Sequence, residues 1–176
     1  ARSYGVFFTA EEVKGKRHFG AKIIPARGAW IEIETDADGQ LQVRIDRKRK
    51  FPATSLLRVL GAHFDSDIKS LFAHSEYAKQ WLAEALENDP AKTVEDAYVE
   101  IHKRLRDGDL ATAANAREYI NSIFSEERYD ISRVGRYRFN QRFNKSLDEK
   151  ELTRKTLSID DLVTVLTHVL ELENDP

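Results

Sequence analysis

The sequence predicts an α+β fold, with an antiparallel β-sheet unit in residues 1–51 and a mainly helical part in residues 52–176. Two patterns predict this class. Apolar and polar residues alternate on both sides of a turn within residues 28–50, as in strands with one buried face. Further along, apolar residues recur every three or four positions, as in helices. The length of 176 residues suits one domain, so we expect both parts to belong to a single domain.

Residues 28–50 predict a β-hairpin around the turn sequence Asp-Ala-Asp-Gly. The alternating apolar positions are Ile31, Ile33, Val43 and Ile45. A three-residue loop at residues 37–39 places Ile33 opposite Val43, whereas a four-residue loop would mix the apolar and polar faces. We therefore predict the three-residue loop, with Gly39 in the left-handed position of a type I turn followed by a G1 bulge.

The polar face of this hairpin carries an aromatic side chain beside charged ones. The predicted register places Trp30 opposite Asp46 and Glu32 opposite Arg44, the second being a favourable cross-strand pair. The densest basic cluster of the chain lies here: Arg44, Arg47, Lys48, Arg49 and Lys50. Basic residues beside an exposed aromatic ring can hold phosphates and stack an unpaired base, whereas a solvated strand end is the alternative interpretation. Because the net charge is only −2, nucleic-acid contact would have to come from this local patch.

Two further strands are predicted before the hairpin, at residues 4–9 and 17–25, with a charged turn at residues 11–16 between them. After the hairpin, apolar periodicity predicts about six helices. They lie at about residues 52–60, 65–72, 75–87, 93–105, 112–124 and 158–170. The first third of the chain is therefore expected to form the sheet and the remainder to pack helices around it.

Several helix starts carry capping signals. Thr93 is a predicted N-cap, and Ser158 with Asp161 forms a variant of the capping box at the start of the last helix. The second helix is predicted to be capped by Asp65 or Ser66. These side chains satisfy backbone N–H groups that the first turn of a helix leaves unpaired.

Two later segments are less regular. Residues 125–142 are aromatic and basic, and no element is assigned to them. Their arginines are Arg133, Arg136, Arg138 and Arg142. Because aromatic residues are interleaved, core packing under arginine stems is as well supported as binding. Residues 145–155 are polar and predict a surface loop.

Residues typical of catalytic or metal sites do not cluster in this sequence. The five histidines are scattered, with no pair at metal-ligand spacing: His18, His63, His74, His102 and His168. Asp160 and Asp161 lie at a predicted helix N-terminus, which favours acids, and a catalytic carboxylate pair is the weaker interpretation. The absence of Cys excludes disulfides and thiolate metal sites. No apolar run reaches the roughly 18 residues of a membrane span, and a cytoplasmic protein is expected.

Six segments resemble the lobe domain (domain 2) of the β subunit of bacterial DNA-directed RNA polymerase. In chain order they are RSYGVFF at 2–8, AKIIPARGAWIE at 21–32, VRIDRKRKFPATSLLRVLG at 43–61, YVEIHKRLRDGD at 98–109, SEERYDISRVGRYRFN at 125–140 and LSIDDLVTVLTHVLEL at 157–172. Their order and spacing fit the family over nearly the whole chain. The abrupt apolar start and polar end then indicate a lobe fragment that is truncated at both ends.

The chain departs from the family pattern at two places. The family usually reads RSPGV where this chain has RSYGV at residues 2–6. It usually reads RPGEPPT where this chain has RDGDLAT at residues 106–112. We expect the loss of these prolines to reshape the second turn without touching the proposed DNA-binding face.

The resemblance implies a non-catalytic part of a nucleotidyltransferase. The lobe would form a wall of the DNA cleft and border downstream duplex DNA and the non-template strand. Position by position, it implies DNA contacts for Arg2, Trp30, Asp46 and Arg47, with Trp30 stacking on an unpaired base; the basic cluster adds Arg44, Lys48 and Arg49. No cofactor is implied for this segment, because the Mg²⁺ ions of the parent enzyme are bound by another subunit. The implied partners are DNA, the β′, α and ω subunits and a sigma factor in the nucleoid.

A second hypothesis is a docking module for a transcription factor, of the kind that is excised for interaction studies. A free-standing enzyme is a third and weakly supported hypothesis, because no catalytic grouping is visible in the sequence.

Overall fold

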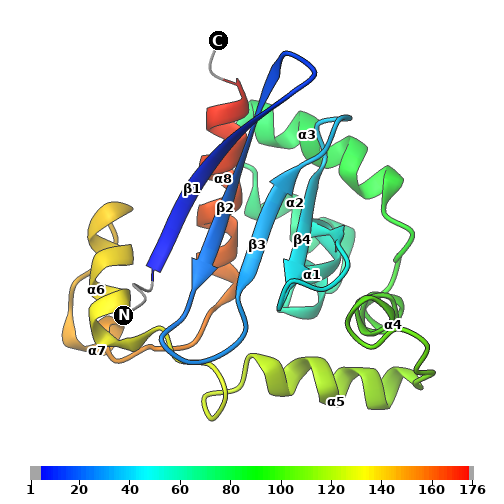
Figure 1. The fold of residues 1–176 in the computed structure, drawn as a ribbon. Coiled ribbons are helices and arrows are strands. Elements are labelled where there is room, and N and C mark those ends of the chain that lie inside the picture. The colour runs from blue at the N-terminus through cyan, green and yellow to red at the C-terminus, as the bar shows by residue number, and fades with distance from the viewer. Residues whose placement is uncertain (1–4, 175–176) are drawn as a thin grey trace.

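Five strands form one antiparallel sheet in the computed structural model, which describes residues 5–174. They lie side by side in chain order: β1 (Gly5–Val13), β2 (Lys16–Ile24), β3 (Ile31–Thr35), β4 (Leu41–Ile45) and β5 (Phe51–Pro52) (Figure 1). Helices occupy most of the remaining chain. The predicted α+β class, with the sheet first and the helices after it, is confirmed.

The β3–β4 hairpin has the predicted register and loop. Its apolar cross-strand pairs are Ile33 with Val43 and Ile31 with Ile45. The backbone N–H of Asp36 donates to the carbonyl of Gln40 at 2.9 Å, so three residues remain in the loop. Gly39 has a φ of +83°, as the type I turn with a G1 bulge requires. The alternation of apolar and polar residues therefore predicted both the register and the turn correctly.

The β1–β2 hairpin is longer than the sequence predicted. β1 continues to Val13, and the turn is confined to Lys14 and Gly15, whose φ angles are +52° and +80°. The charged residues expected in a turn therefore lie in the strands. Because β1 pairs only with β2, its side chains face solvent along much of its length and tolerate charge.

The part of the chain described by the structure contains eight helices rather than about six. They are α1 (Ala53–Val59), α2 (Asp65–Leu71), α3 (Glu76–Asn88), α4 (Val94–Leu105), α5 (Ala113–Ile123), α6 (Ser132–Arg142), α7 (Glu149–Leu152) and α8 (Ile159–Asn174). Six of them match predicted helices. The additional ones are α6 and the single-turn α7, which lies in the segment predicted as a surface loop.

The sequence did not predict α6, because the face of this helix that packs inward is not apolar. The residues that it buries are Gly135, Arg136, Phe139 and Asn140. Only one of these four carries an apolar side chain, so the stripe of hydrophobic residues that identifies a helix in sequence is absent. The helix is stabilised instead by polar partners from other segments, which a local pattern cannot reveal.

Two of the three predicted caps are confirmed. The Thr93 hydroxyl accepts from Asp96 N at 3.1 Å, and Ser158 exchanges hydrogen bonds with Asp161 as a capping box. The prediction for α2 was wrong, because its N-cap position is Phe64. The Asp67 carboxylate accepts from Phe64 N at 3.1 Å there, so an acid inside the first turn performs the capping.

The core lies between one face of the sheet and the helices α1, α2, α3 and α8 (Figure 1). Ile31 and Val43 from the sheet belong to the same buried apolar cluster as Leu56 of α1 and Leu166 of α8. The opposite face of β3 and β4 carries polar, partly buried side chains. The sheet is thus supported from one side, and its ends remain available to carry a surface site.

Candidate nucleic-acid interface

The predicted DNA-binding residues of the hairpin gather at one end of the sheet. Because β3 and β4 are antiparallel, the residue before β3 and the residue after β4 lie side by side. Asp46 N donates to Trp30 O at 2.9 Å, which places these residues opposite each other as predicted. In Figure 1 this end, where β2 connects to β3, lies opposite the tip of the β3–β4 hairpin.

The basic cluster begins in a tight turn that follows β4. Asp46 and Arg47 both have left-handed φ angles, of +56° and +60°, and Lys48 N donates to Ile45 O at 3.1 Å. Two consecutive left-handed residues define a type I′ turn, which matches the twist of the strands that it joins. Asp tolerates this conformation, but a left-handed Arg costs about 1–2 kcal/mol. The turn therefore displays Arg47 at a backbone position that ordinarily favours Gly or Asn.

Trp30 and Arg47 form a cation–π contact. The Arg47 Cζ atom lies 4.5 Å from the centroid of the Trp30 ring. Trp30 is only partly exposed, whereas the sequence predicted an exposed aromatic ring. The predicted position of the ring beside the basic cluster is confirmed, and Arg47 is its direct neighbour.

Arg44 braces the turn from within β4. Its Nε donates to Glu34 Oε1 at 3.1 Å, and its Nη1 donates to Lys48 O at 3.0 Å. Glu32 is the residue opposite in the register, but its carboxylate approaches Lys22 at 4.0 Å instead. The predicted Glu32–Arg44 neighbours are therefore correct for the backbone, whereas the ion pair runs diagonally because the longer Arg44 side chain reaches Glu34.

The far side of the basic cluster contacts the turn between α4 and α5. Arg49 Nη1 lies 3.5 Å from Asp107 Oδ1, and both side chains are exposed. The turn at residues 106–112 was expected to lie away from the proposed DNA-binding face, and this ion pair shows that it reaches the face. Lys48 and Lys50 are exposed on either side of Arg49.

The connection that carries Trp30 rests on the segment before α6. Arg27 and Asp130 exchange two backbone hydrogen bonds, of 3.0 and 2.8 Å. Gly28 has a φ of +124°, and a Cβ atom added to it would lie 2.8 Å from Arg128 O and 3.0 Å from the Tyr129 ring. Only glycine fits this position, because both the backbone angle and the space exclude a side chain. Sequence reasoning missed these supporting residues, although both segments lie within motifs that carry the family resemblance, at residues 21–32 and 125–140.

Tyr129 anchors this contact from inside the core. Its side chain is fully buried, and burial raises the pKa of its hydroxyl above the ordinary value, an effect that the nearby Asp161 carboxylate reinforces. The ring lies 5.9 Å from that of Phe124, centroid to centroid. The Trp30 connection is therefore attached to a packed aromatic residue more than half the chain away.

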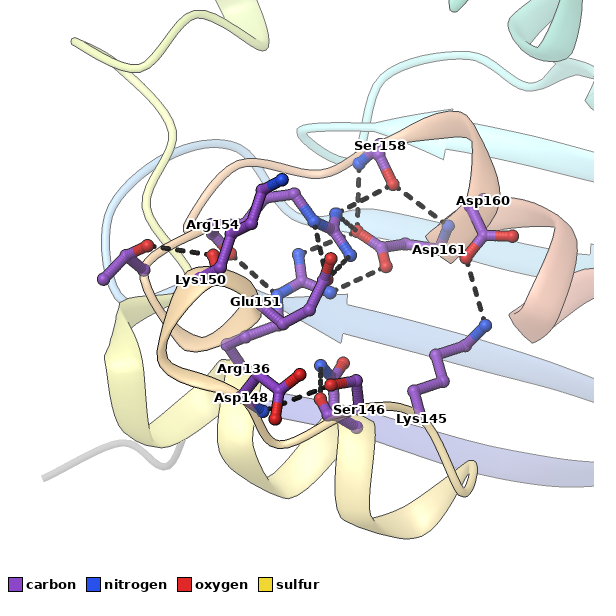
Figure 2. A network of polar contacts seen from close by, with 12 residues as sticks. Arg136, Lys145, Ser146, Asp148, Lys150, Glu151, Arg154, Ser158, Asp160 and Asp161 are labelled. Carbon is purple, nitrogen blue, oxygen red and sulfur yellow. Dashed lines mark hydrogen bonds and ion pairs between the residues drawn. The ribbon is translucent and has the colours of Figure 1, made fainter.

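The second basic group divides between the core and the surface: Arg136 is buried in a structural network (Figure 2), whereas Arg133, Arg138 and Arg142 are exposed. Arg136 is fully buried and makes a bidentate ion pair with Asp161, with Nη1–Oδ1 and Nη2–Oδ2 distances of 2.7 and 2.8 Å. Its Nε donates to Arg154 O at 2.7 Å, and its Nη2 also donates to Thr156 O at 2.9 Å. One guanidinium thus joins α6, the α7–α8 connection and the start of α8.

The carboxylates at the start of α8 are engaged in this network. Burial alone would raise the pKa of Asp161, but the hydrogen bonds and positive charge of Arg136 outweigh it and hold the pKa below its usual value. Arg154 and the Ser158 backbone N–H also contact this carboxylate, at 3.3 and 3.0 Å. Asp160 pairs with Lys145 at 3.0 Å. The pair therefore stabilises the fold, and the weaker interpretation as catalytic carboxylates finds no support in its geometry.

One predicted contact residue, Arg2, lies outside the described residues. Across residues 5–174, no three or more His, Asp or Glu side chains come together in a way that could hold a metal ion. Over the same span, the helices are all too short or too polar to cross a bilayer.

The chain is an α+β domain whose sheet carries a tight basic turn and an aromatic ring at one end, and family comparison identifies the kind of domain. The family model described as "RNA polymerase Rpb2, domain 2" matches residues 2–176. The chain therefore belongs to the family of RNA polymerase Rpb2 domain 2.

Curated relatives carry the name DNA-directed RNA polymerase subunit beta. The protein from Alkaliphilus oremlandii is 45% identical over 145 residues, which cover 81% of this chain and 11% of the relative. The protein from Clostridioides difficile is 45% identical over 143 residues, covering 80% and 11% of the two chains. The one from Exiguobacterium sp. is 45% identical over 145 residues, covering 81% and 12%. The chain thus spans about one-ninth of the length of these relatives.

Proposed function

We propose that this chain is the non-catalytic lobe of a bacterial RNA polymerase β subunit. It forms a wall of the DNA cleft, and its basic turn contacts the non-template strand and downstream duplex DNA. The observation that carries this proposal is the Trp30 ring beside Arg47 at the end of the sheet, next to further exposed cations. An aromatic face stacks an unpaired base whatever its identity, and the surrounding cations hold the phosphates.

The residues around the Trp30 ring have different roles in DNA binding. Lys48 and Arg49 contact phosphates, because both are exposed and flank the turn. Arg44 acts mainly by holding the turn, since its guanidinium is already bonded to Glu34 and to the turn backbone. The exposed Asp46 carboxylate accepts a hydrogen bond from a base edge or orients a neighbouring arginine.

The setting of this activity is the whole polymerase. The partners that we propose are DNA, the β′, α and ω subunits and a sigma factor, in the cytoplasm at the nucleoid. Nucleotide transfer, with Mg²⁺, takes place on another subunit. The lobe contributes positioning of the DNA, and its own residues perform no bond making or breaking.

The test uses the whole polymerase with 2-aminopurine placed at successive positions of the non-template strand. A stacked base has quenched fluorescence, so one position in the bubble should be quenched and should brighten in Trp30→Ala. Loss of one stacked base should shorten the lifetime of the open complex by about fivefold or more, since such stacking contributes about 1–3 kcal/mol. Primer extension on a preformed scaffold should continue at an undiminished rate.

The controls separate stacking from folding. Trp30→Phe keeps an aromatic face and should retain most of the quenching, and Trp81→Phe changes the other tryptophan, which is buried. An abasic site at the quenched position should reproduce the effect of Trp30→Ala, and combining the two should add little. If every position keeps its fluorescence in Trp30→Ala, or if this variant cannot extend a primer, the assignment of Trp30 is wrong.

A docking site for a transcription factor is the second function that we propose. The observation that favours it is the exposure of two large apolar side chains in the helical part, Phe64 at 70% and Leu110 at 94%. Exposed apolar side chains of this size are typical of interaction surfaces when they are close enough to share a partner. Hydrogen exchange on the polymerase with and without a factor tests this function. Protection of the segments around Phe64 and Leu110 supports docking, and protection confined to the Trp30 turn refutes it.

A further inference from the structure

The stacking surface of Trp30 is already occupied within the chain itself. The Arg47 guanidinium carbon lies 4.5 Å from the centroid of the Trp30 ring, at the distance of a cation–π contact. Trp30 is only partly exposed, whereas Arg47 is exposed. A base that stacks on the ring face beneath the guanidinium must first displace it.

We propose that Arg47 is a movable lid over Trp30, which competes with an unpaired base for the ring and is released to a phosphate when the base binds. This inference rests on the proposed function of Trp30 as a stacking platform. It assigns Arg47 a role different from that of a simple phosphate contact. A residue that only contacts phosphate strengthens DNA binding. Arg47 as a lid also weakens DNA binding, because its cation–π contact with Trp30 must be broken before a base can stack.

The backbone beneath the lid is fixed while its side chain reaches solvent. Arg47 occupies the second left-handed position of the type I′ turn, and Lys48 N closes this turn on Ile45 O. Arg44 Nη1 holds Lys48 O at 3.0 Å, and the same guanidinium is bonded to Glu34. These contacts fix where the Arg47 side chain begins. Its exposed guanidinium can then exchange the ring for a phosphate by rotation about side-chain bonds alone.

The two contacts that exchange have unequal strengths. A cation–π contact at an exposed site changes an equilibrium by about two- to fivefold, whereas stacking of a base on an aromatic side chain changes it by about fivefold or much more. A base that stacks well therefore displaces Arg47, and a site that lacks a base does not. The lid thus lowers the affinity of every base that stacks on this ring face by about two- to fivefold.

The first arm of the test measures the lid without DNA. The chain has two tryptophans, so Trp81→Phe leaves Trp30 as the single fluorescent reporter. Acrylamide, a neutral quencher, then reports access to the ring. Arg47→Gln, which keeps a long polar side chain but removes the charge, should raise the quenching constant, because the cation–π contact that covers the ring face is lost. The matched variant Lys48→Gln removes the same charge one residue further on and should leave quenching unchanged.

The second arm measures DNA binding by the same variants, using an oligothymidylate of about ten residues and an abasic strand of equal length. At low salt both Arg47→Gln and Lys48→Gln should bind the oligothymidylate more weakly, because each loses a phosphate contact. In about 0.5 M salt, where phosphate contacts are screened, Arg47→Gln should bind about two- to fivefold more tightly than the parent chain. Lys48→Gln should show no such gain.

The outcomes separate the lid from the platform. Unchanged acrylamide quenching in Arg47→Gln overturns the lid, and so does increased quenching without any gain in high-salt affinity, while the preference for base-bearing DNA persists. A different result would be equal binding of abasic and base-bearing strands by the parent chain and all variants. That result removes the stacking platform itself, and with it the proposed function on which the lid depends.

Discussion

Two arginine-rich regions of this chain look alike in sequence and play opposite parts in the structure. Arg136 and Arg47 each lie over an aromatic ring, with Cζ-to-centroid distances of 5.5 Å to Phe139 and 4.5 Å to Trp30. Arg136 is fully buried and bonded to a carboxylate and two carbonyls. Arg47 is exposed on a turn.

The difference shows that the partners of a guanidinium, rather than its neighbours in sequence, decide its role. A buried charge requires a matched partner, because water no longer solvates it, and Asp161 supplies this match for Arg136. An exposed guanidinium keeps its hydration and can change partners at little cost. The core region therefore ties its segments together, whereas the exposed Arg47 can exchange one partner for another.

The largest loss of stability is expected for Arg136→Met, which removes the buried ion pair with Asp161. Removing Arg136 leaves the buried Asp161 carboxylate with only Arg154 and the Ser158 N–H as partners, and this should reduce the free energy of unfolding by about 3–5 kcal/mol. Urea denaturation measures the loss. The double variant Arg136→Met/Asp161→Leu removes both charges and should recover much of it. A single variant as stable as the double one would contradict the assignment.

Acid should break the same ion pair by protonation. Because the folded-state pKa of Asp161 is lowered, the pair contributes its stability fully above the unfolded-state pKa of about 3.9. This contribution is lost as the pH falls through the still lower folded-state pKa. The urea midpoint should therefore fall steeply below about pH 4, and less steeply in Arg136→Met/Asp161→Leu. Equal acid sensitivity of the two proteins would show that other carboxylates carry the effect.

Gly28→Ala should disturb the support of the surface region. The φ of +124° disfavours alanine by about 1–3 kcal/mol, and the new Cβ atom would also clash with Arg128 O at 2.8 Å. Gly39→Ala is the matched control, since Gly39 has a φ of +83° but nothing within 4 Å of an added Cβ. We expect the Gly28 variant to lose more stability and to shift the emission of Trp30, and the Gly39 variant to leave Trp30 unchanged. Equal losses would mean that the contact with Tyr129 contributes nothing.

The hairpin could be predicted from sequence because its rules are local. Alternation fixed which residues face the core, and the Asp-Ala-Asp-Gly turn then left only one loop length that kept Ile33 opposite Val43. The neighbours Trp30 and Asp46 followed from the same register. The alternation of apolar and polar residues thus allows the turn to predict which residues face each other at the opposite end of both strands.

The remaining features depend on contacts distant in sequence. Arg136 becomes a core residue because Asp161, 25 residues further on, comes to face it. The Trp30 connection is held by Asp130 and Tyr129, with which it shares no sequence pattern. The contact of Arg47 with Trp30 depends on the left-handed turn at Asp46 and Arg47. This turn contains no glycine, so the sequence did not predict it.

The smallest effect on stability is expected at the surface, in Asp107→Asn. The ion pair of Asp107 with Arg49 joins two exposed side chains, so its loss should change the free energy of unfolding by less than about 1 kcal/mol. Loss of the carboxylate also frees Arg49 for phosphate, so single-stranded DNA should bind more tightly at low salt. Arg49→Ala should instead lower the slope of log affinity against log salt by about 1.

These paired variants complete the comparison between the two regions. Removing one partner of the Arg136 pair should destabilise the chain strongly, because the other charge is shielded from water. Breaking one partner of the Arg49 pair should leave the fold intact and change only the ligand that the other partner meets. If Asp107→Asn destabilised the chain as strongly as Arg136→Met, Arg49 would be a structural residue. Its assignment as a phosphate contact would then be wrong.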